Sequence, residues 1–178
     1  FENCPLLGEM ELPEQLVSIG NHAFAYCTSL EEMKFPGTLT SIGVYAFGNT
    51  SIKEVVLPKK LATLKNNAFE NCSELESVHI PSTLKEVGYY GVFASCPKLQ
   101  TVTFEEGITE IPSNLFAESG LKEIALPETI TSIGDYAFRD CAQLEKITIP
   151  NGVTSIGNYT FENCPLLGEM ELPEQLVS

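Results

Sequence analysis

The sequence predicts a solenoid built from short parallel β-strands, with one strand in each turn of the chain. Three observations support this prediction. A phenylalanine recurs at intervals of 22 to 24 residues, an alternating apolar segment follows each one, and a proline follows that segment in seven of the eight rows. One row of this length cannot bury its own apolar side, so neighbouring rows must stack. The anchor phenylalanines are Phe1, Phe24, Phe47, Phe69, Phe93, Phe116, Phe138 and Phe161.

Each part of a row has a physical interpretation. Residues 33–35 and 147–149 alternate apolar and polar side chains, which is the period of a strand with one buried face. The proline that follows has no N–H and ends the strand ladder at a fixed place. A glycine later in the row, such as Gly43, permits a bend. The Ala-Phe pair after it places a large ring beside a small residue, as stacked layers require.

In outline a row reads L-x-x-φ-x-φ-P-x-x-φ-x-x-φ-G-x-x-A-F-x-x-C, where φ is apolar. This pattern closely resembles the BspA-like class of leucine-rich repeats, found in surface proteins of bacteria and some protists. The resemblance covers the whole chain. It implies a right-handed leucine-rich-repeat solenoid with a parallel sheet on one face and turns and short irregular or helical segments on the other. Row 93–115 departs most, because Glu105 replaces the proline, Pro112 the glycine and Leu115 the alanine.

The first and last eighteen residues are identical, since FENCPLLGEMELPEQLVS fills both 1–18 and 161–178. Ordinary rows have diverged: residues 24–41 match the first eighteen residues at only eight positions. The rows therefore form a unit of 160 residues, and 1–178 is predicted to be a single continuous solenoid of seven full rows and a partial one. Two interpretations stay open. The chain is a window on a long array of such units, which the lack of polar caps favours, or it is one unit with a duplicated edge.

Composition excludes several functions. The apolar fraction of 43% can form a substantial core, and no apolar run approaches the roughly 18 residues that cross a bilayer. The formal net charge is −14, from 24 acidic and 10 basic residues. Such a charge repels phosphate backbones and anionic membrane surfaces. We therefore expect no nucleic-acid partner and no membrane insertion in this segment.

The six cysteines occupy one position, three residues after the anchor. An even number of cysteines suggests disulfides. The alternative, which we favour, is a ladder of buried thiols that act as small apolar groups, because two rows have Thr50 or Ser119 at this position and cannot pair. No disulfides are expected. The ladder consists of Cys4, Cys27, Cys72, Cys96, Cys141 and Cys164.

Nothing in the sequence indicates catalysis. One cysteine in each row forms a line, which does not give the tetrahedral ligand set of zinc. The two histidines, His22 and His79, belong to different rows and different faces, whereas a nucleophile and its base need hydrogen-bond contact. We predict no enzyme activity, no metal and no cofactor.

The outward positions of the predicted strands form an open face. A solvated face is the simplest interpretation. The functional interpretation is a protein-binding surface of the kind that solenoids present, with weak contacts that add up along an array. The candidate binding residues are Glu9, Glu11, Glu32, Lys34, Glu54, His79, Thr101, Thr103, Glu123, Lys146, Thr148, Glu169 and Glu171.

Two other features lie near the turns. The N-x-S/T sequences at Asn49, Asn71 and Asn158 are glycosylation sites if the source is eukaryotic. Tyrosines cluster just before the anchors, as at Tyr45 and Tyr136. Their rings are expected to cover the outer ridge of the core, and lateral contact between solenoids is the alternative.

Two functions remain in view. The first, implied by the resemblance, is a non-enzymatic module at the cell surface or outside the cell, which serves adhesion or binds proteins or other extracellular surface ligands. The second is a structural subunit of a filament or long tandem array, formed by end-to-end continuation of the 160-residue unit.

Overall fold

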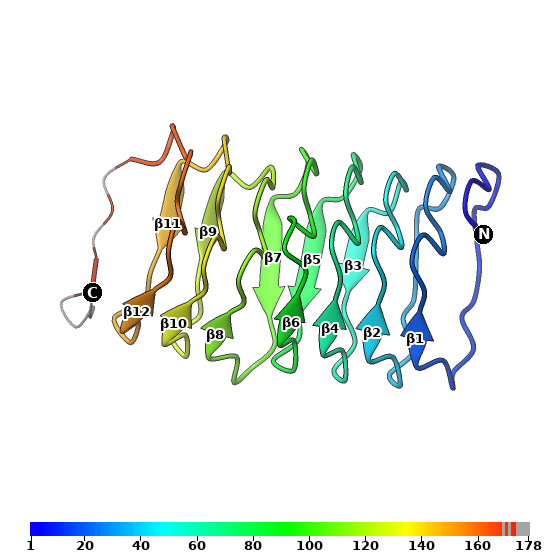
Figure 1. Ribbon diagram of the computed structural model, residues 1–178, viewed down its shortest axis with the longest axis horizontal. Helices are drawn as coiled ribbons and strands as arrows, with labels where there is room; N and C mark the ends of the chain where they lie inside the picture. The colour runs from blue at the N-terminus through cyan, green and yellow to red at the C-terminus, as the bar shows by residue number, and fades with distance from the viewer. Residues whose placement is uncertain (169, 171, 174–178) are drawn as a thin grey trace.

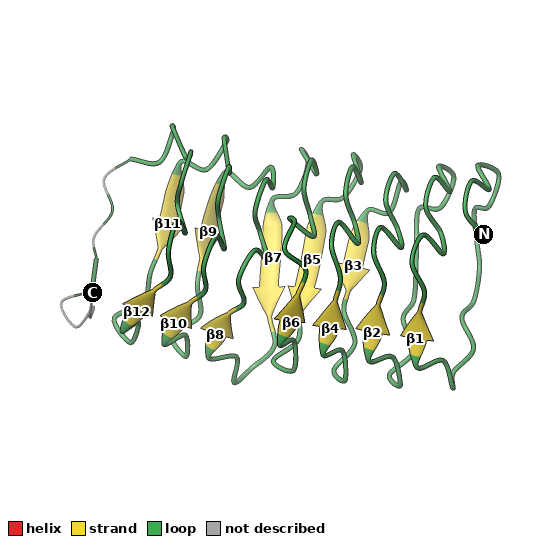
Figure 2. Cartoon of the chain, in the orientation of Figure 1, coloured by secondary structure: helices red, strands yellow, loops and turns green. Residues whose placement is uncertain are grey.

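The computed structural model describes residues 1–168, 170, 172 and 173. The chain winds into a solenoid whose turns follow one another from the N-terminus to the C-terminus (Figure 1). All strand pairs are parallel, as predicted. No helix occurs in the described residues, so turns and short strands occupy the side where helical segments were one possibility (Figure 2).

Most rows contain two strands rather than the single predicted strand. The longer strand of a row lies at the predicted alternating segment. These strands are β3 (Glu54–Val56), β5 (Ser77–Ile80), β7 (Thr101–Phe104), β9 (Glu123–Ala125) and β11 (Lys146–Thr148). The alternation is clear in β5, where Val78 and Ile80 are buried and Ser77 and His79 are half-exposed. The equivalent segments of the first two rows, near residues 9–11 and 32–34, have no strand ladder.

A second set of strands, each of two residues, forms where the chain returns across the row. They are β1 (Ser18–Ile19), β2 (Ser41–Ile42), β4 (Thr63–Leu64), β6 (Glu86–Val87), β8 (Glu110–Ile111), β10 (Ser132–Ile133) and β12 (Ser155–Ile156). They pair in register from row to row, for example Ile42 with Leu64. Sequence analysis missed this sheet, because two residues are too few to show an alternating pattern.

Both sets of strands are interrupted at row 93–115. The longer strands form the sheets β3-β5-β7 and β11-β9, and the shorter strands form β1-β2-β4-β6 and β12-β10-β8. Row 93–115 therefore pairs with the rows before it through β7 and with the rows after it through β8.

The anchor phenylalanines form a continuous stack along the inside of the solenoid. Phe47, Phe69, Phe93, Phe116 and Phe138 are fully buried. Successive rings lie nearly parallel, with centroids 5.1–5.6 Å apart at six of the seven steps and 6.3 Å apart between Phe93 and Phe116. Rings at this spacing gain both burial and aromatic stacking energy.

The recurring glycine is needed for space and not for a special backbone angle. A Cβ at Gly134 would lie 2.5 Å from the backbone nitrogen of Ser113 in the preceding row, and one at Gly157 would lie 2.4 Å from that of Asp135. Neither glycine has a positive φ. Glycine therefore lets two neighbouring rows approach closely, where we had expected it to permit a bend.

In most rows, two residues adopt the left-handed backbone conformation. One lies two residues before the anchor phenylalanine, and the other lies two residues after it. Their φ angles lie between 54° and 62°, and none is a glycine. Asparagine tolerates this conformation, but tyrosine does so less readily. These residues turn the chain sharply between rows. They are Asn3, His22, Tyr26, Tyr45, Asn49, Asn67, Asn71, Ser95, Asn114, Glu118, Tyr136, Asp140, Tyr159 and Asn163.

Candidate binding surface on the strand face

The strand face is the surface formed by the outward side chains of the longer strands and of the equivalent positions in the first two rows. Nearly all of the predicted binding residues are exposed there: Glu9, Glu11, Glu32, Lys34, Glu54, Thr101, Thr103, Glu123, Lys146 and Thr148. His79 is half-exposed, and its Nδ1 lies 2.9 Å from Thr103 Oγ1 of the next row. Glu169 and Glu171 lie outside the described residues.

A hollow of about 340 Å³ opens on the strand face where β7 and β9 are not hydrogen-bonded to each other. It brings together four of the predicted residues, Thr101, Glu123, Lys146 and Thr148, from three strands. The other lining residues are not among the predicted binding residues, and they are Gln100, Val102, Ile124 and Ala125. Since Ile124 is buried and Glu123 and Lys146 are exposed, the hollow has an apolar floor and a charged rim.

A second hollow, of about 660 Å³, lies between the first two rows, which also lack a strand ladder. Four carboxylates and one ammonium line it, so its potential is negative. Apolar side chains lie among them. The lining residues are Glu9, Met10, Glu11, Leu12, Glu14, Glu32, Lys34, Phe35 and Pro36. Four of these, Glu9, Glu11, Glu32 and Lys34, are predicted binding residues.

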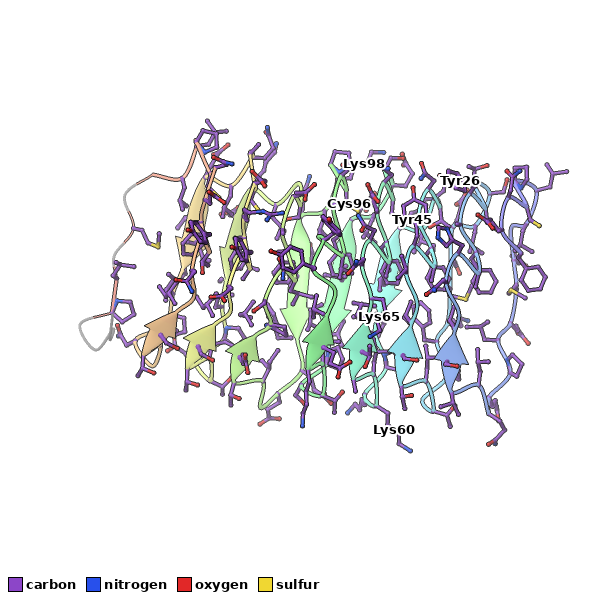
Figure 3. The ribbon with its side chains drawn as sticks, in the orientation of Figure 1. Tyr26, Tyr45, Lys60, Lys65, Cys96 and Lys98 are labelled. Atoms are coloured by element: carbon purple, nitrogen blue, oxygen red, sulfur yellow. The ribbon has the colours of Figure 1, made fainter. Side chains whose placement is uncertain are left out.

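Charges elsewhere form exposed pairs between neighbouring rows. Lys53 Nζ lies 2.6 Å from Glu31 Oε2, and Lys98 Nζ lies 2.6 Å from Glu74 Oε2. Glu31 raises the pKa of the Lys53 ammonium. Exposed pairs of this kind are screened by solvent, so they adjust the surface potential more than the stability. Lys98 and Cys96, two residues apart, are labelled in Figure 3.

The cysteines line the interior as free thiols. Cys27, Cys72, Cys96 and Cys141 are buried, and each donates its S–H to the anchor carbonyl of an earlier row, as Cys96 does to Phe69 at 3.2 Å. Burial raises the pKa of Cys141 to about 12, and the Cys72 thiol together with burial raises that of Cys96 well above its usual range. Thiols in this state are poor nucleophiles.

Among the described residues, the two histidines lie in separate surroundings. His22 Nδ1 lies 3.7 Å from Glu2 Oε1 and its ring is 5.5 Å from Tyr45, whereas His79 contacts Thr103 on the strand face. In the part of the chain that the structure describes, no group of three or more His, Cys, Asp or Glu side chains could hold a metal ion.

The asparagines of the three sequons differ in accessibility. Asn49 is half-buried and its side-chain amide is hydrogen-bonded to the Tyr45 hydroxyl, while Asn71 and Asn158 are exposed. The backbone N–H of Asn158 donates to Asp135 Oδ1 at 2.6 Å. Glycosylation stays a prediction for all three residues.

The tyrosines form a ridge near the turns. Tyr26 and Tyr45, labelled side by side in Figure 3, have ring centroids 5.7 Å apart, and Tyr136 stacks on Tyr159 at 5.3 Å. Burial raises the pKa of the Tyr45 hydroxyl to about 12. Tyr26 and Tyr159 are exposed, whereas Tyr45 and Tyr136 are half-buried, so part of the ridge is accessible at the surface.

The repeating row, the stacked anchors and the open strand face define a parallel β-solenoid of the leucine-rich-repeat class. A family model described as the BspA type leucine rich repeat region matches residues 1–122 and 89–178, with six copies. The chain belongs to this family.

Solved structures share the fold. A leucine-rich repeat protein from Bacteroides ovatus is 28% identical with a TM-score of 0.68, and the match covers 93% of this chain and 49% of that one. The leucine rich repeat protein of T. pallidum is 27% identical with a TM-score of 0.70, covering 89% and 77%. A leucine rich cell surface protein from Faecalibacterium prausnitzii is 29% identical with a TM-score of 0.52, covering 88% and 57%.

The chain thus spans about half the length of the Bacteroides ovatus protein. A search of curated protein sequences found no match. Among the described residues, no helix is both long enough and apolar enough to span a membrane.

Proposed function

We propose that the chain is a non-enzymatic repeat module that binds proteins through its strand face, at the cell surface or outside the cell, where it serves adhesion. The observation that carries the proposal is the pair of hollows on that face, which together contain eight of the predicted binding residues. Each hollow combines apolar side chains with charged ones, which is the composition that protein contacts use.

The family and one structural neighbour support the location. The chain belongs to the BspA type repeat family, and the Faecalibacterium prausnitzii protein is described as a leucine rich cell surface protein. The strand face lacks exposed tryptophan and arginine, the residues that dominate tight contacts. Each contact is therefore expected to be weak, and several rows or several copies must act together to give strong adhesion.

The experiment measures binding of the fluorescent chain to intact cells and to immobilised surface-protein extracts at low and high salt. The test variant is Thr101→Arg with Thr148→Arg, which fills the hollow between β7 and β9. The matched control adds the same two charges elsewhere, at Gln143 and Ser155, which are exposed and line neither hollow. We expect only the test variant to lose binding. Equal binding by all three proteins would contradict a role for this face.

The 160-residue period favours a second candidate function, a structural array or filament. Residues 161–168 continue the stack of row 138–160, and Phe161 stacks on Phe138 with centroids 5.6 Å apart. The repeat of the first row is thus compatible with continuation of the solenoid. The intact mass of the native polypeptide tests this: a mass many times 19.5 kDa supports a tandem array, and a mass near 19.5 kDa contradicts it.

A further inference from the structure

The tyrosine ridge includes a patch of exposed rings where the row pattern is broken. Row 69–92 is one residue longer than the usual row, and it contributes both Tyr89 and Tyr90. These side chains are 61% and 54% exposed, so they do not complete the core. The Tyr90 ring lies edge-on to Tyr89 with centroids 5.9 Å apart, and the Tyr89 ring lies 6.3 Å from that of Tyr136. We call Tyr89, Tyr90 and Tyr136 the aromatic patch.

The backbone holds the patch in place. The Tyr89 N–H donates to Asn66 Oδ1 of the preceding row at 2.8 Å. Gly91 is buried, and a Cβ there would clash with the Ala117 carbonyl oxygen. Asn114, at the equivalent position of the next row, is also buried. Where other rows have a tyrosine at this position, the exposed rings therefore come from the longer row instead. Exposed apolar patches of this kind mark interaction sites.

Carboxylates lie close to the patch. The pKa of the Tyr136 hydroxyl is raised, first by burial and then by the neighbouring Tyr89, Tyr159, Asp135 and Glu162. Two acidic side chains therefore act on this ring. Together with the formal net charge of −14, they give the region a negative potential.

One cation of the chain already lies on a ring of the patch. The guanidinium carbon of Arg139 is 5.2 Å from the centre of the Tyr136 ring, within the roughly 6 Å at which a cation is attracted to an aromatic face. The Arg139 charge is paired, since its Nη2 lies 3.5 Å from Glu118 Oε1 and its Nε lies 3.0 Å from Asp140 Oδ2. Arg139 thus shows how a guanidinium is held on this patch, while its own charge is balanced locally.

We propose that the aromatic patch binds a basic segment of a partner protein, whose arginine side chains lie on the rings of Tyr89 and Tyr90. The rings attract guanidinium groups, and the acidic surroundings add a longer-range attraction. A second copy of this chain fits the patch poorly, because two chains of net charge −14 repel each other. The three tyrosines line neither hollow of the strand face, so this surface is separate from the proposed function.

The test measures binding of a fluorescent oligoarginine peptide to the full 178-residue chain by fluorescence anisotropy. The test variant is Tyr89→Leu with Tyr90→Leu, which removes both exposed rings and leaves the net charge unchanged. The matched control is Tyr89→Phe with Tyr90→Phe, which keeps the rings. We expect the leucine variant to bind about fivefold or more weakly, and the phenylalanine variant to bind within about twofold of the unmodified chain.

Two outcomes of this comparison would overturn the proposal. Equal binding by the leucine variant and the unmodified chain would mean that net charge alone holds the peptide. An equal loss in the leucine and phenylalanine variants would mean that the hydroxyl groups make the contact and the ring faces do not. If the double leucine variant does not fold, Tyr90→Leu alone gives the same comparison, because Tyr90 is more than half exposed.

Two further measurements test the location and the occupant. Tyr26, which is 43% exposed in another part of the ridge, should be replaceable by leucine without loss of peptide binding. A loss there as large as in the double variant would contradict a site at the aromatic patch. Light scattering during gel filtration should show no dimer that depends on Tyr89 and Tyr90. A dimer that the unmodified chain forms and the leucine variant does not would assign the patch to a second copy and overturn the proposal.

Discussion

The rows before residue 93 and the rows after residue 116 follow the same pattern, but the join between them differs from the joins within each group. Within each group, anchor rings are 5.1–5.6 Å apart and the short strands pair in register. At the join, Phe93 and Phe116 are 6.3 Å apart, and both strand ladders are interrupted in row 93–115. The same core therefore continues through a change in backbone pairing.

Pro112 contributes to the interruption of the short strands. In other rows the residue at this position donates its N–H to the preceding row: Gly43 to Ile19, Gly88 to Leu64 and Gly134 to Ile111. Proline has no N–H, so the equivalent bond to Val87 cannot form. Pro112 therefore removes one bond from the ladder, while the core continues through the join.

The row before the join is one residue longer than the usual row, and the extra length appears at Tyr89 and Tyr90. The ring of Tyr89 reaches within 6.3 Å of Tyr136, two rows further on. Asn114 lies in the intervening row and is buried, and its Oδ1 has no hydrogen-bond partner in the described structure. The hollow beside β7 and β9 opens at this same join, where the ladder of longer strands is interrupted.

The largest predicted effect concerns the anchor phenylalanines. It is a difference between Phe47, which lies within the first group of rows, and Phe116, which lies at the join. Phe47 contacts three rings at 5.1–5.5 Å, whereas Phe116 has one ring at 5.4 Å and two at 6.3–6.4 Å. Replacing a buried phenylalanine by alanine costs about 3–5 kcal/mol. We expect Phe47→Ala to lie near the top of that range and Phe116→Ala near the bottom, by urea denaturation. Equal losses of stability in the two variants would show that the Phe116 ring packs as well at the join as the Phe47 ring does within its group.

The second prediction concerns the close approach of rows. Gly134→Ala should lower the free energy of unfolding by about 1–3 kcal/mol, because the new Cβ meets the Ser113 backbone at 2.5 Å. Gly20 is the matched control, since it occupies the same position in the first row and a Cβ there meets nothing within 4 Å. Gly20→Ala should leave the stability unchanged or raise it slightly. Thermal and urea denaturation of both variants measures the difference.

The third prediction aims to repair the join. Pro112→Gly supplies the missing N–H, and one backbone hydrogen bond contributes about 1 kcal/mol. The greater freedom of glycine in the unfolded chain costs about 0.4–1 kcal/mol, so we expect almost no net change. The control is Pro127→Gly, which ends a strand and has no ladder bond to restore. Pro127→Gly should lower the free energy of unfolding. An equal loss in the two variants would mean that the N–H introduced at position 112 does not donate to the Val87 carbonyl.

The sequence predicted the row, the anchors and the buried face of each longer strand, because these features repeat with a fixed period. Residues 93–115 were expected to depart most, and both ladders are interrupted there. Sequence analysis did not find the two hollows, because they depend on which neighbouring strands fail to pair and not on residue type. The binding positions Thr101 and Glu123 were predicted, but their shared hollow with Val102 could only come from the structure.

The smallest predicted effect tests how row 93–115 is attached to the rows before it. Glu105 stands where other rows have proline, and its Oε2 accepts the backbone N–H of Ser82 at 3.0 Å and the Ser82 hydroxyl at 2.9 Å. Lys59 Nζ lies 3.3 Å from Oε1. These contacts, the Ser82 N–H foremost, lower the pKa of Glu105. The carboxylate therefore stabilises the fold above its unfolded-state pKa of about 4.3, and this contribution is lost as the pH falls through the lower, folded-state pKa.

Glu105→Gln removes the charge and keeps the shape of the side chain, so the variant should lose less stability than the unmodified chain when the pH falls from 5 to 3. Urea midpoints at pH 7, 5 and 3 give this comparison. The control is Glu106→Gln, because Glu106 is exposed and the described residues supply it with no hydrogen bond or ion pair. Its acid sensitivity should match that of the unmodified chain. If Glu105→Gln behaves like this control, the carboxylate does not attach the row, and the other contacts, among them the β5–β7 ladder and the ring stack, hold it to the rows before it.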